Sequence, residues 1–434
     1  MAVTSNWCRC TSCHAGYGWK DNSFDFSRQS AMDCLVCHDT TGTYKKFPTD
    51  CGHPPYKEKV FAGKKVFKPV DLKKVAQNVG LTSRRSCGAC HFFSGGGDGV
   101  KRGDMNTALL APSKELDVHM DAKGLNFSCT VCHTTFAHRI DGRNYRTPAP
   151  GKAKMALPRD DGHRVRCESC HGNAPHKSVD KLNHHTRRIA CETCHVPLYG
   201  CGKPTKVWWD WSTAGKFGPG HKIVVEKDEM GKPIYHTKKG SMKWAKDVVP
   251  EYFWYNGTIS YTLVTDKIPD DQRPIWLNRP LGSPDDPGSK IFPFKVHRGK
   301  QPFDPVNRTM VVPKLFGKKG TGAFWAEFDW LKAAAAGMKE AGAPFSGKLE
   351  FVETRYHLPL AHMVPPKEQA LKCEQCHVRT GGRLAAISGV YIPGRDIFQS
   401  VDDTGWIIAG LALAVVALHG AIRFMSAGRK GKKK

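Results

Sequence analysis

One short motif occurs seven times in this chain: two cysteines separated by two residues and followed directly by a histidine. The cysteine pairs are Cys10/Cys13, Cys34/Cys37, Cys87/Cys90, Cys129/Cys132, Cys167/Cys170, Cys191/Cys194 and Cys373/Cys376. The histidines that follow them are His14, His38, His91, His133, His171, His195 and His377. Zinc and iron–sulfur cysteine pairs need no following histidine, whereas covalent haem attachment does. The motif therefore predicts seven covalently attached c-type haems.

The spacing follows from the chemistry of attachment. Two thiols bond to the vinyl groups on one edge of a porphyrin, and the two intervening residues let the chain arch so that both sulfurs reach it. The next side chain then points at the iron, which imidazole binds strongly. Because haems supply much of the apolar core, we expect a mainly α fold with extensive irregular loops. It would wrap around a packed haem array and end in one C-terminal transmembrane helix.

The motifs divide the sequence into four expected parts. Residues 1–200 hold six attachment sites and form a haem-rich domain. Residues 201–370 contain no site, are rich in aromatic residues, and are expected to cover the haem array with loops and short strands. Their clearest helix is predicted over 324–341, where an alanine run is followed by Gly342. Residues 371–400 hold the seventh site and a linker, and 401–434 form an anchor with a basic tail.

Residues 406–425 are mostly apolar, and about 20 such residues are enough to cross a bilayer. Asp402 and Asp403 precede them and a cluster of lysines follows, so the basic end is expected in the cytoplasm. This places the haem domain in the periplasm, on the outer face of a bacterial inner membrane, where c-type haem is attached. A buried core helix is the alternative, because His419 and Arg423 weaken the span.

The chain carries a formal net charge of +26, which haem propionates would reduce. Its lysines and arginines are spread along the sequence without a recognition module, so we expect no nucleic-acid partner. The charge favours small anionic substrates and acidic redox partners. We expect electrons to come from a membrane quinol-oxidising protein or a small cytochrome.

Haems that only transfer electrons usually keep two strong axial ligands, since an unchanged coordination shell costs little reorganisation. The twenty histidines less the seven in the motifs leave thirteen candidates for the distal ligands. His419 is set aside with the apolar span, while His221, His236 and His297 equally suit a polar or substrate-facing role. The expected distal ligands are His53, His119, His138, His163, His176, His184 or His185, and His362.

Several long stretches resemble the octahaem cytochromes of the tetrathionate reductase family, and the resemblance covers nearly the whole chain. They are residues 10–20, 33–44, 87–104, 254–257, 295–301 and 362–365. The resemblance implies a periplasmic oxidoreductase that reduces small sulfur or nitrogen compounds such as tetrathionate, nitrite or hydroxylamine. It also implies one haem with a lysine ligand, best matched by Lys101. Our hypothesis for catalysis adds Arg102 and nearby lysines as the groups that hold an anion.

The family has eight haems, whereas this sequence shows seven attachment sites. The first seven residues lack the basic and apolar regions of a signal peptide. We therefore expect the missing site and a signal peptide to precede Met1. The alternative function is a membrane-anchored electron conduit without a substrate of its own, and an oxidative enzyme ranks lower because no tyrosine is assignable as a haem cross-link.

Three cysteines lie outside the motifs: Cys8, Cys51 and Cys201. A disulfide between Cys51 and Cys201 is one interpretation in an oxidising compartment. A reactive thiol near the active haem, at Cys8 or Cys51, is the other.

Overall fold

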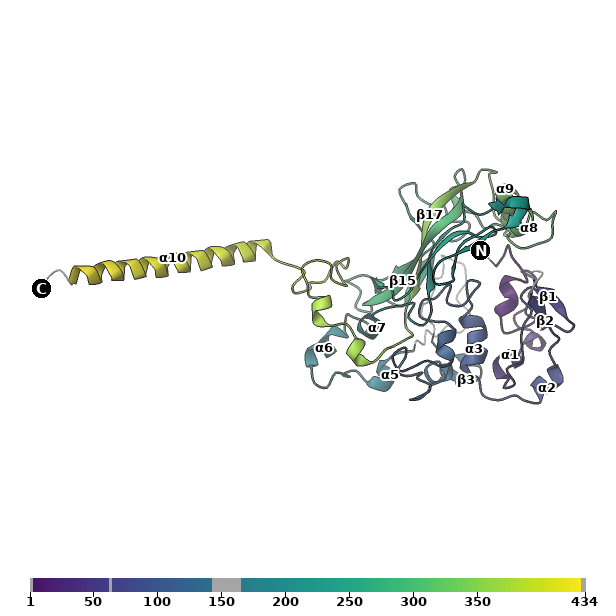
Figure 1. The fold of residues 1–434 in the computed structure, drawn as a ribbon, viewed down its shortest axis with the longest axis horizontal. Coiled ribbons are helices and arrows are strands. Elements are labelled where there is room, and N and C mark those ends of the chain that lie inside the picture. Colours follow the sequence, from purple (N-terminus) through teal and green to yellow (C-terminus); the bar gives the residue numbers. More distant parts are fainter. Residues whose placement is uncertain (1–2, 62–64, 143–164, 431–434) are drawn as a thin grey trace. The chain divides into compact units, whose positions relative to one another are not determined.

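The computed structural model describes residues 3–61, 65–142 and 165–430, and the chain divides into two units, 1–371 and 372–434 (Figure 1). The first unit combines short helices with a large sheet. Its helices are α1 (Leu35–His38), α2 (Leu72–Ala76), α3 (Arg84–His91), α4 (Cys129–Cys132), α5 (Glu168–His171), α6 (Asp180–His185), α7 (Cys191–His195), α8 (Phe324–Glu327) and α9 (Trp330–Glu340). Its 3-10 turns are η1 (Cys10–Cys13), η2 (Gln29–Ala31), η3 (Thr107–Leu110), η4 (Pro219–His221) and η5 (Lys367–Gln369).

Nine strands form the main sheet, in the order β13-β17-β15-β5-β10-β9-β8, with β11 and β16 paired to further parts of β15. The strands are β5 (Thr205–Asp210), β8 (Val225–Lys227), β9 (Pro233–His236), β10 (Gly240–Ala245), β11 (Glu251–Tyr255), β13 (Ile275–Trp276), β15 (Lys290–Asp304), β16 (Thr309–Met310) and β17 (Glu350–Pro359). β15 runs antiparallel to β17 and parallel to β5. Four two-stranded sheets complete the set: β1 (Lys59–Phe61) with β2 (Lys65–Phe67), β3 (Thr135–Phe136) with β4 (Arg139–Ile140), β6 (Phe217–Gly218) with β7 (Lys222–Ile223), and β12 (Thr258–Tyr261) with β14 (Asn278–Leu281).

The prediction of a mainly α fold was wrong, because the chain is 25% helix and 21% strand. The cause lies in the segment 201–370, whose aromatic and β-branched residues suit a pleated surface covered on both faces. β15 shows this most clearly: it is fifteen residues long, and most of its side chains are buried. The haem motifs contribute little helix, because each needs only one turn.

The predicted helix over 324–341 is two helices in the structure. α8 ends at Phe328, whose φ of 56° lies in the left-handed region that a helix cannot continue. α9 then restarts at Trp330, with the Asp329 side chain accepting a hydrogen bond from the backbone N–H of Lys332 as an N-cap. The alanine run lies in α9 and packs Ala333 against Trp211 and Phe324.

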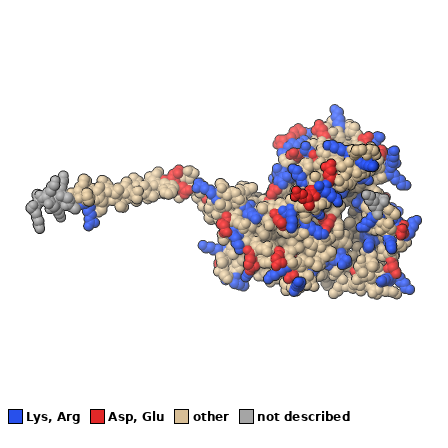
Figure 2. Space-filling model, viewed as in Figure 1, with Lys and Arg blue, Asp and Glu red and all other residues tan. Residues whose placement is uncertain are grey.

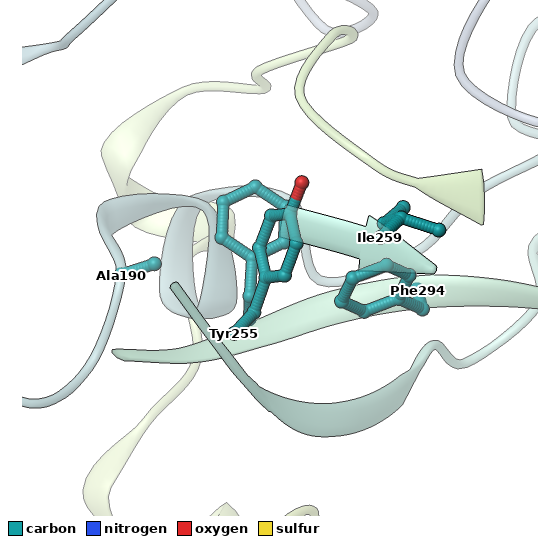
Figure 3. Close-up of a cluster of buried hydrophobic side chains, with 5 residues drawn as sticks. Ala190, Tyr255, Ile259 and Phe294 are labelled. Atoms are coloured by element: carbon teal, nitrogen blue, oxygen red, sulfur yellow. The ribbon is translucent and has the colours of Figure 1, made fainter. Parts of the chain in front are cut away.

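The sheet is packed directly against the helix of the sixth attachment site. The N–H of Ala190 donates to the carbonyl of Ile291 at 3.0 Å, and the Thr193 hydroxyl donates to the same carbonyl at 2.7 Å. Around this junction, Ala190 meets Tyr255, Ile259 and Phe294 in a buried cluster (Figure 3). Since Phe294 and Ile259 are fully buried, the sheet and the haem-rich segment share one core.

The second unit carries η6 (Cys373–Gln375) and ends in α10 (Gln399–Lys430). Residues 399–426 of α10 have a mean hydropathy of 2.1 and are not buried by the protein. Among the described residues, this is the one helix that is long and apolar enough to cross a membrane. Its apolar surface contrasts with the first unit, where lysines, arginines and acids are interspersed over the visible face (Figure 2). Exposure on all sides disfavours the alternative of a buried core helix.

Candidate functional site

Each of the seven motifs lies at a short helical segment, and four of the attachment histidines are held by hydrogen bonds from Nδ1. The Nδ1–H groups of His38, His133 and His377 donate to the carbonyls of Gly80, Asp141 and Pro393, at 2.8, 2.9 and 2.9 Å. This contact fixes the tautomer, so Nε2 is the nitrogen that is free to bind a metal. His14 bonds to the carbonyl of Thr11, and its Nε2 is buried without a hydrogen-bond partner. The orientation fits histidines that bind iron through Nε2.

Four attachment histidines face a second histidine from a distant part of the sequence. The distances between ring centres are 6.2 Å for His38 and His138, 6.2 Å for His133 and His362, 6.0 Å for His171 and His119, and 6.2 Å for His195 and His176. Two iron–imidazole bonds of about 2.0 Å, with each ring centre about 1.15 Å beyond its nitrogen, place axial imidazoles about 6.3 Å apart. The four pairs therefore have the spacing that two axial ligands of one haem iron require.

The remaining predicted distal ligands lie differently. His53 stacks on Tyr17 at 5.3 Å and accepts or donates a hydrogen bond at the Tyr56 hydroxyl. His184 is exposed and lies 3.2 Å from Asp180, one turn earlier in α6, while His185 ends that helix. His163 lies outside the described residues. Within the described part of the chain, neither His14 nor His91 has a second histidine in ring contact.

The motif cysteines all reach the surface of the protein at least in part, and each lies outside the disulfide that the structure describes. The exposed ones are Cys13, Cys34, Cys132, Cys170 and Cys373. The half-buried ones are Cys10, Cys37, Cys87, Cys90, Cys129, Cys167, Cys191, Cys194 and Cys376. These positions do not test thioether bonds, so haem attachment at each of the fourteen cysteines stays a prediction.

Neighbouring motifs bring some of their cysteines together. The thiols of Cys13 and Cys90 interact directly, as do those of Cys87 and Cys129. Cys167 interacts with Cys191 in the same way. If each cysteine pair carries one edge of a porphyrin, haems at the first, third and fourth sites would form one series of neighbours, and those at the fifth and sixth would form a pair.

The first cysteines of the fifth and sixth motifs, Cys167 and Cys191, contact each other. The second cysteines, Cys170 and Cys194, lie near other parts of the chain. Cys170 is near the fourth motif, since its charge adds to burial in raising the pKa of the Cys132 thiol. The carbonyl of Cys194 accepts a hydrogen bond from the N–H of Leu371 at 3.0 Å. Cys170 thus brings the fifth motif close to the fourth, and haems attached at these motifs would be near enough to exchange electrons.

The expected disulfide between Cys51 and Cys201 was wrong: Cys51 is bonded to Cys8. This bond also removes Cys8 and Cys51 as candidate reactive thiols. Cys201 is free, and burial raises the pKa of its thiol to about 12, so it is not a reactive thiolate either. Sequence spacing cannot select a pairing that depends on which loops meet in the fold.

Lys101 and Arg102 follow the glycine-rich stretch after α3, and they differ in their contacts. Protein surrounds Lys101 on most sides although its side chain remains accessible, and its Nζ lies 5.6 Å from the Tyr356 ring centre. Burial, with a contribution from Arg102, lowers the pKa of Lys101. Arg102 donates to both oxygens of Asp104, at 3.1 and 3.0 Å, and to the carbonyl of Pro359. Arg102 therefore lies next to Lys101 in the sequence, and its guanidinium is paired with the buried carboxylate of Asp104.

Two lysines that the motif analysis missed extend this positive region into the sheet. Lys295 on β15 is fully buried, and its Nζ donates to the carbonyls of Val100 and Lys101 at 3.1 and 2.9 Å. Lys206 on β5 is 2% exposed, and its Nζ lies 3.4 Å from the centre of the Trp209 ring and 5.2 Å from that of Trp244. We call Lys206 and Lys295 the buried basic cluster, beside which lies the more exposed Lys101. Lys295 begins one of the stretches that carry the family resemblance, whereas no local pattern marks Lys206, which ordinary strand sequence surrounds.

The cluster extends toward the first attachment site. Burial lowers the pKa of Lys206 to about 6, with further lowering by Lys239 and Lys295. Lys239 is in turn affected by the charge of Arg9, which directly precedes Cys10. The pKa of Lys295 is lowered to about 7, mainly by burial. The charge of Asp104 opposes this lowering, and the charge of Arg102 adds to it. Positive groups thus run from β15 to the motif that contains His14.

Comparisons with known proteins were made on the sequence and on the fold. A family model described as bacterial cytochrome c matches residues 206–380, which include most of the main sheet and the seventh motif. The structure of octahaem cytochrome c from Shewanella oneidensis is similar, with 42% identity and a TM-score of 0.75, covering 89% of this chain and 82% of that chain. An uncharacterised protein of Archaeoglobus fulgidus is 29% identical over 138 residues, which span 30% of this chain and 46% of the archaeal protein.

Proposed function

Because the chain belongs to the octahaem c-type cytochromes of the tetrathionate reductase family, we propose that it reduces a small sulfur or nitrogen compound at one haem. The other haems supply that haem with electrons. The observation that carries the proposal is the buried basic cluster, which favours an anion such as tetrathionate or nitrite. Hydroxylamine, which is not an anion, fits the cluster less well.

Burying a cation costs free energy unless an opposite charge or hydrogen bonds compensate it. Among the described residues, Asp104 is the acid that acts on Lys295, and Arg102 and His362 already bind Asp104. Hydrogen bonds to Val100, Lys101 and Thr205 hold the ammonium of Lys295, but the described acids balance its charge only in part, in surroundings where electrostatic attraction is stronger than in water. Either a substrate anion or a haem propionate supplies the balancing charge, and the kinetic test below separates the two.

His14 and His91 both have no facing histidine among the described residues, and we assign the substrate to the haem at Cys10 and Cys13, because the positive groups that begin at Lys295 end beside that motif. Its histidine, His14, has Trp19 and Phe24 as edge-on ring neighbours, at 5.4 and 5.5 Å, instead of a facing histidine. The bound haem would supply electrons and an iron with an exchangeable ligand position.

Lys101 is the candidate ligand in place of a histidine. An amine must be neutral to bind iron, and the lowered pKa of Lys101 favours that form. Lys206 and Lys295 have different work, because their pKa values of about 6 and about 7 let them hold an anion or donate protons near neutral pH. Tetrathionate needs only the first role, since two electrons cleave its central S–S bond and release two thiosulfates. Nitrite needs protons as well.

The position in the cell is also part of the proposal. α10 would anchor the protein in the inner membrane, with its basic end in the cytoplasm and the haems in the periplasm. Electrons would then arrive from a membrane quinol-oxidising protein or from a small cytochrome.

The test is steady-state reduction of tetrathionate, nitrite and hydroxylamine by the haem-loaded full chain, with reduced viologen as donor. Lys295→Met is compared with Lys227→Met, which removes an exposed lysine from β8. We expect Lys295→Met to raise KM for the preferred anion at least tenfold and Lys227→Met to leave it unchanged. Absence of turnover with all three compounds, together with EPR signals of bis-histidine haems alone, would identify an electron conduit instead. An unchanged KM in Lys295→Met would assign the cluster to a propionate.

A further inference from the structure

Asp104 joins a haem ligand to the basic region although it binds no haem itself. It is 1% exposed, and its Oδ2 accepts a hydrogen bond from Nδ1 of His362 at 3.0 Å. The backbone N–H groups of Ala361 and His362 donate to the same oxygen, at 2.9 and 3.2 Å. Arg102 binds the carboxylate from the other side. Burial disfavours the charged form, but Arg102 and His362 hold the pKa of Asp104 well below its usual range.

The distal histidines differ in what their Nδ1 contacts. His362 is bonded to the carboxylate of Asp104, whereas His176 is bonded to the neutral amide oxygen of Asn183 at 3.2 Å. Nδ1 of His119 lies 3.8 Å from Asp117, which is beyond hydrogen-bond distance. Of these three histidines, His362 therefore has the most strongly electron-donating environment.

We propose that Asp104 is a positioning residue that lowers the reduction potential of the haem attached at Cys129 and Cys132. A carboxylate that accepts the Nδ1 proton makes imidazole a stronger donor at Nε2, and this stabilises ferric over ferrous iron. Arg102 weakens the effect, because its guanidinium neutralises part of the same negative charge. The inference needs the haem and the His133–His362 pair, but it does not depend on the identity of the substrate.

The measurement is an EPR-monitored redox titration of the haem-loaded full chain. The rings of His133 and His362 are 19° from parallel, as are those of His176 and His195 at 17°. Near-parallel axial rings give a rhombic low-spin signal, whereas the 78° and 73° pairs would give strongly anisotropic signals. The haem attached at Cys129 and Cys132 should therefore give one of two rhombic signals, since two of the described histidine pairs have near-parallel rings.

Asp104→Asn is expected to raise the midpoint potential of one rhombic signal by about 59 mV. This corresponds to a tenfold change in the equilibrium between ferric and ferrous haem. Arg102→Gln is expected to lower the midpoint of the same signal, since it leaves the carboxylate unneutralised. Asp104→Glu keeps the charge and should restore most of the original value. Asn183→Asp is the reciprocal variant, and it should lower the midpoint of the other rhombic signal.

Two results would overturn the proposal. One is an intact rhombic signal in Asp104→Asn with an unchanged midpoint. The other is a high-spin signal in Asp104→Asn combined with unchanged midpoints in Arg102→Gln and Asn183→Asp, because Asp104 would then only keep His362 in place. A high-spin signal together with a lowered midpoint in Arg102→Gln would still support the electrostatic role.

Discussion

The buried basic cluster predicts that the rate of tetrathionate reduction depends on pH, although the reaction itself takes up no protons. Reduction of tetrathionate to two thiosulfates consumes electrons but no protons, and viologen donates electrons without a proton. Any loss of activity between pH 6 and pH 8 must then come from groups on the enzyme. Lys295 is the main candidate, because burial lowers its pKa to about 7. Its positive charge is present below that value and is lost as the pH rises through it.

The size of the effect follows from the titration. With a pKa of about 7, Lys295 is about 90% protonated at pH 6 and about 10% protonated at pH 8, a ninefold to tenfold change. We expect kcat/KM for tetrathionate to fall about tenfold over this range, since kcat/KM reports groups of the free enzyme. Lys295→Met should lower kcat/KM at pH 6 and shift the remaining fall toward the pKa of Lys206, about 6, while Lys227→Met should keep the original profile. A flat profile in the unchanged protein would refute the assignment of Lys295 to the anion.

Three further predictions concern the haems and the core. EPR of the oxidised protein should show rhombic and strongly anisotropic low-spin signals together, because two described histidine pairs are near-parallel and two are near-perpendicular. Gly52→Ala should lower haem content at the first site, measured as pyridine haemochrome per chain, since its φ is 95° and a Cβ would lie 2.3 Å from the Gly16 carbonyl and 2.8 Å from His14. Phe294→Ala should destabilise the first unit by about 3–5 kcal/mol in denaturant unfolding, because Phe294 is fully buried between the sheet and α7.

The attachment motifs can be recognised in the sequence because they are local. A cysteine pair and the next histidine lie within one helical turn, so the sequence alone names every member of each predicted site. The distal ligands are a different problem, since His133 and His362 meet only after most of the chain has folded between them. Counting histidines gives the candidates, but the pairing depends on tertiary structure.

The sheet was underestimated for a related reason. A segment without haem motifs, interrupted by proline and glycine, suggests loops and short strands. β15 contains Pro293 and Gly299, yet it continues through both for fifteen residues. Gly299 meets the backbone of Trp209 so closely that a Cβ would lie 2.2 Å from its carbonyl oxygen, and the glycine therefore permits the pairing of β15 with β5. A residue that normally indicates a turn is here a condition for strand contact.

The same contacts change the role of the segment 201–370, which the sequence suggested was mainly a cover for the haems. β5 and β15 place Lys206 and Lys295 beside each other, and β17 ends at Pro359, just before His362. The Pro359 carbonyl accepts a hydrogen bond from Arg102, which ties the end of the strand to the stretch that contains Lys101. One sheet thus holds the cations that we assign to the substrate and leads directly to His362, the proposed haem ligand. Charge at the basic cluster would then act on the potential of a haem through the contacts of Arg102, Asp104 and His362.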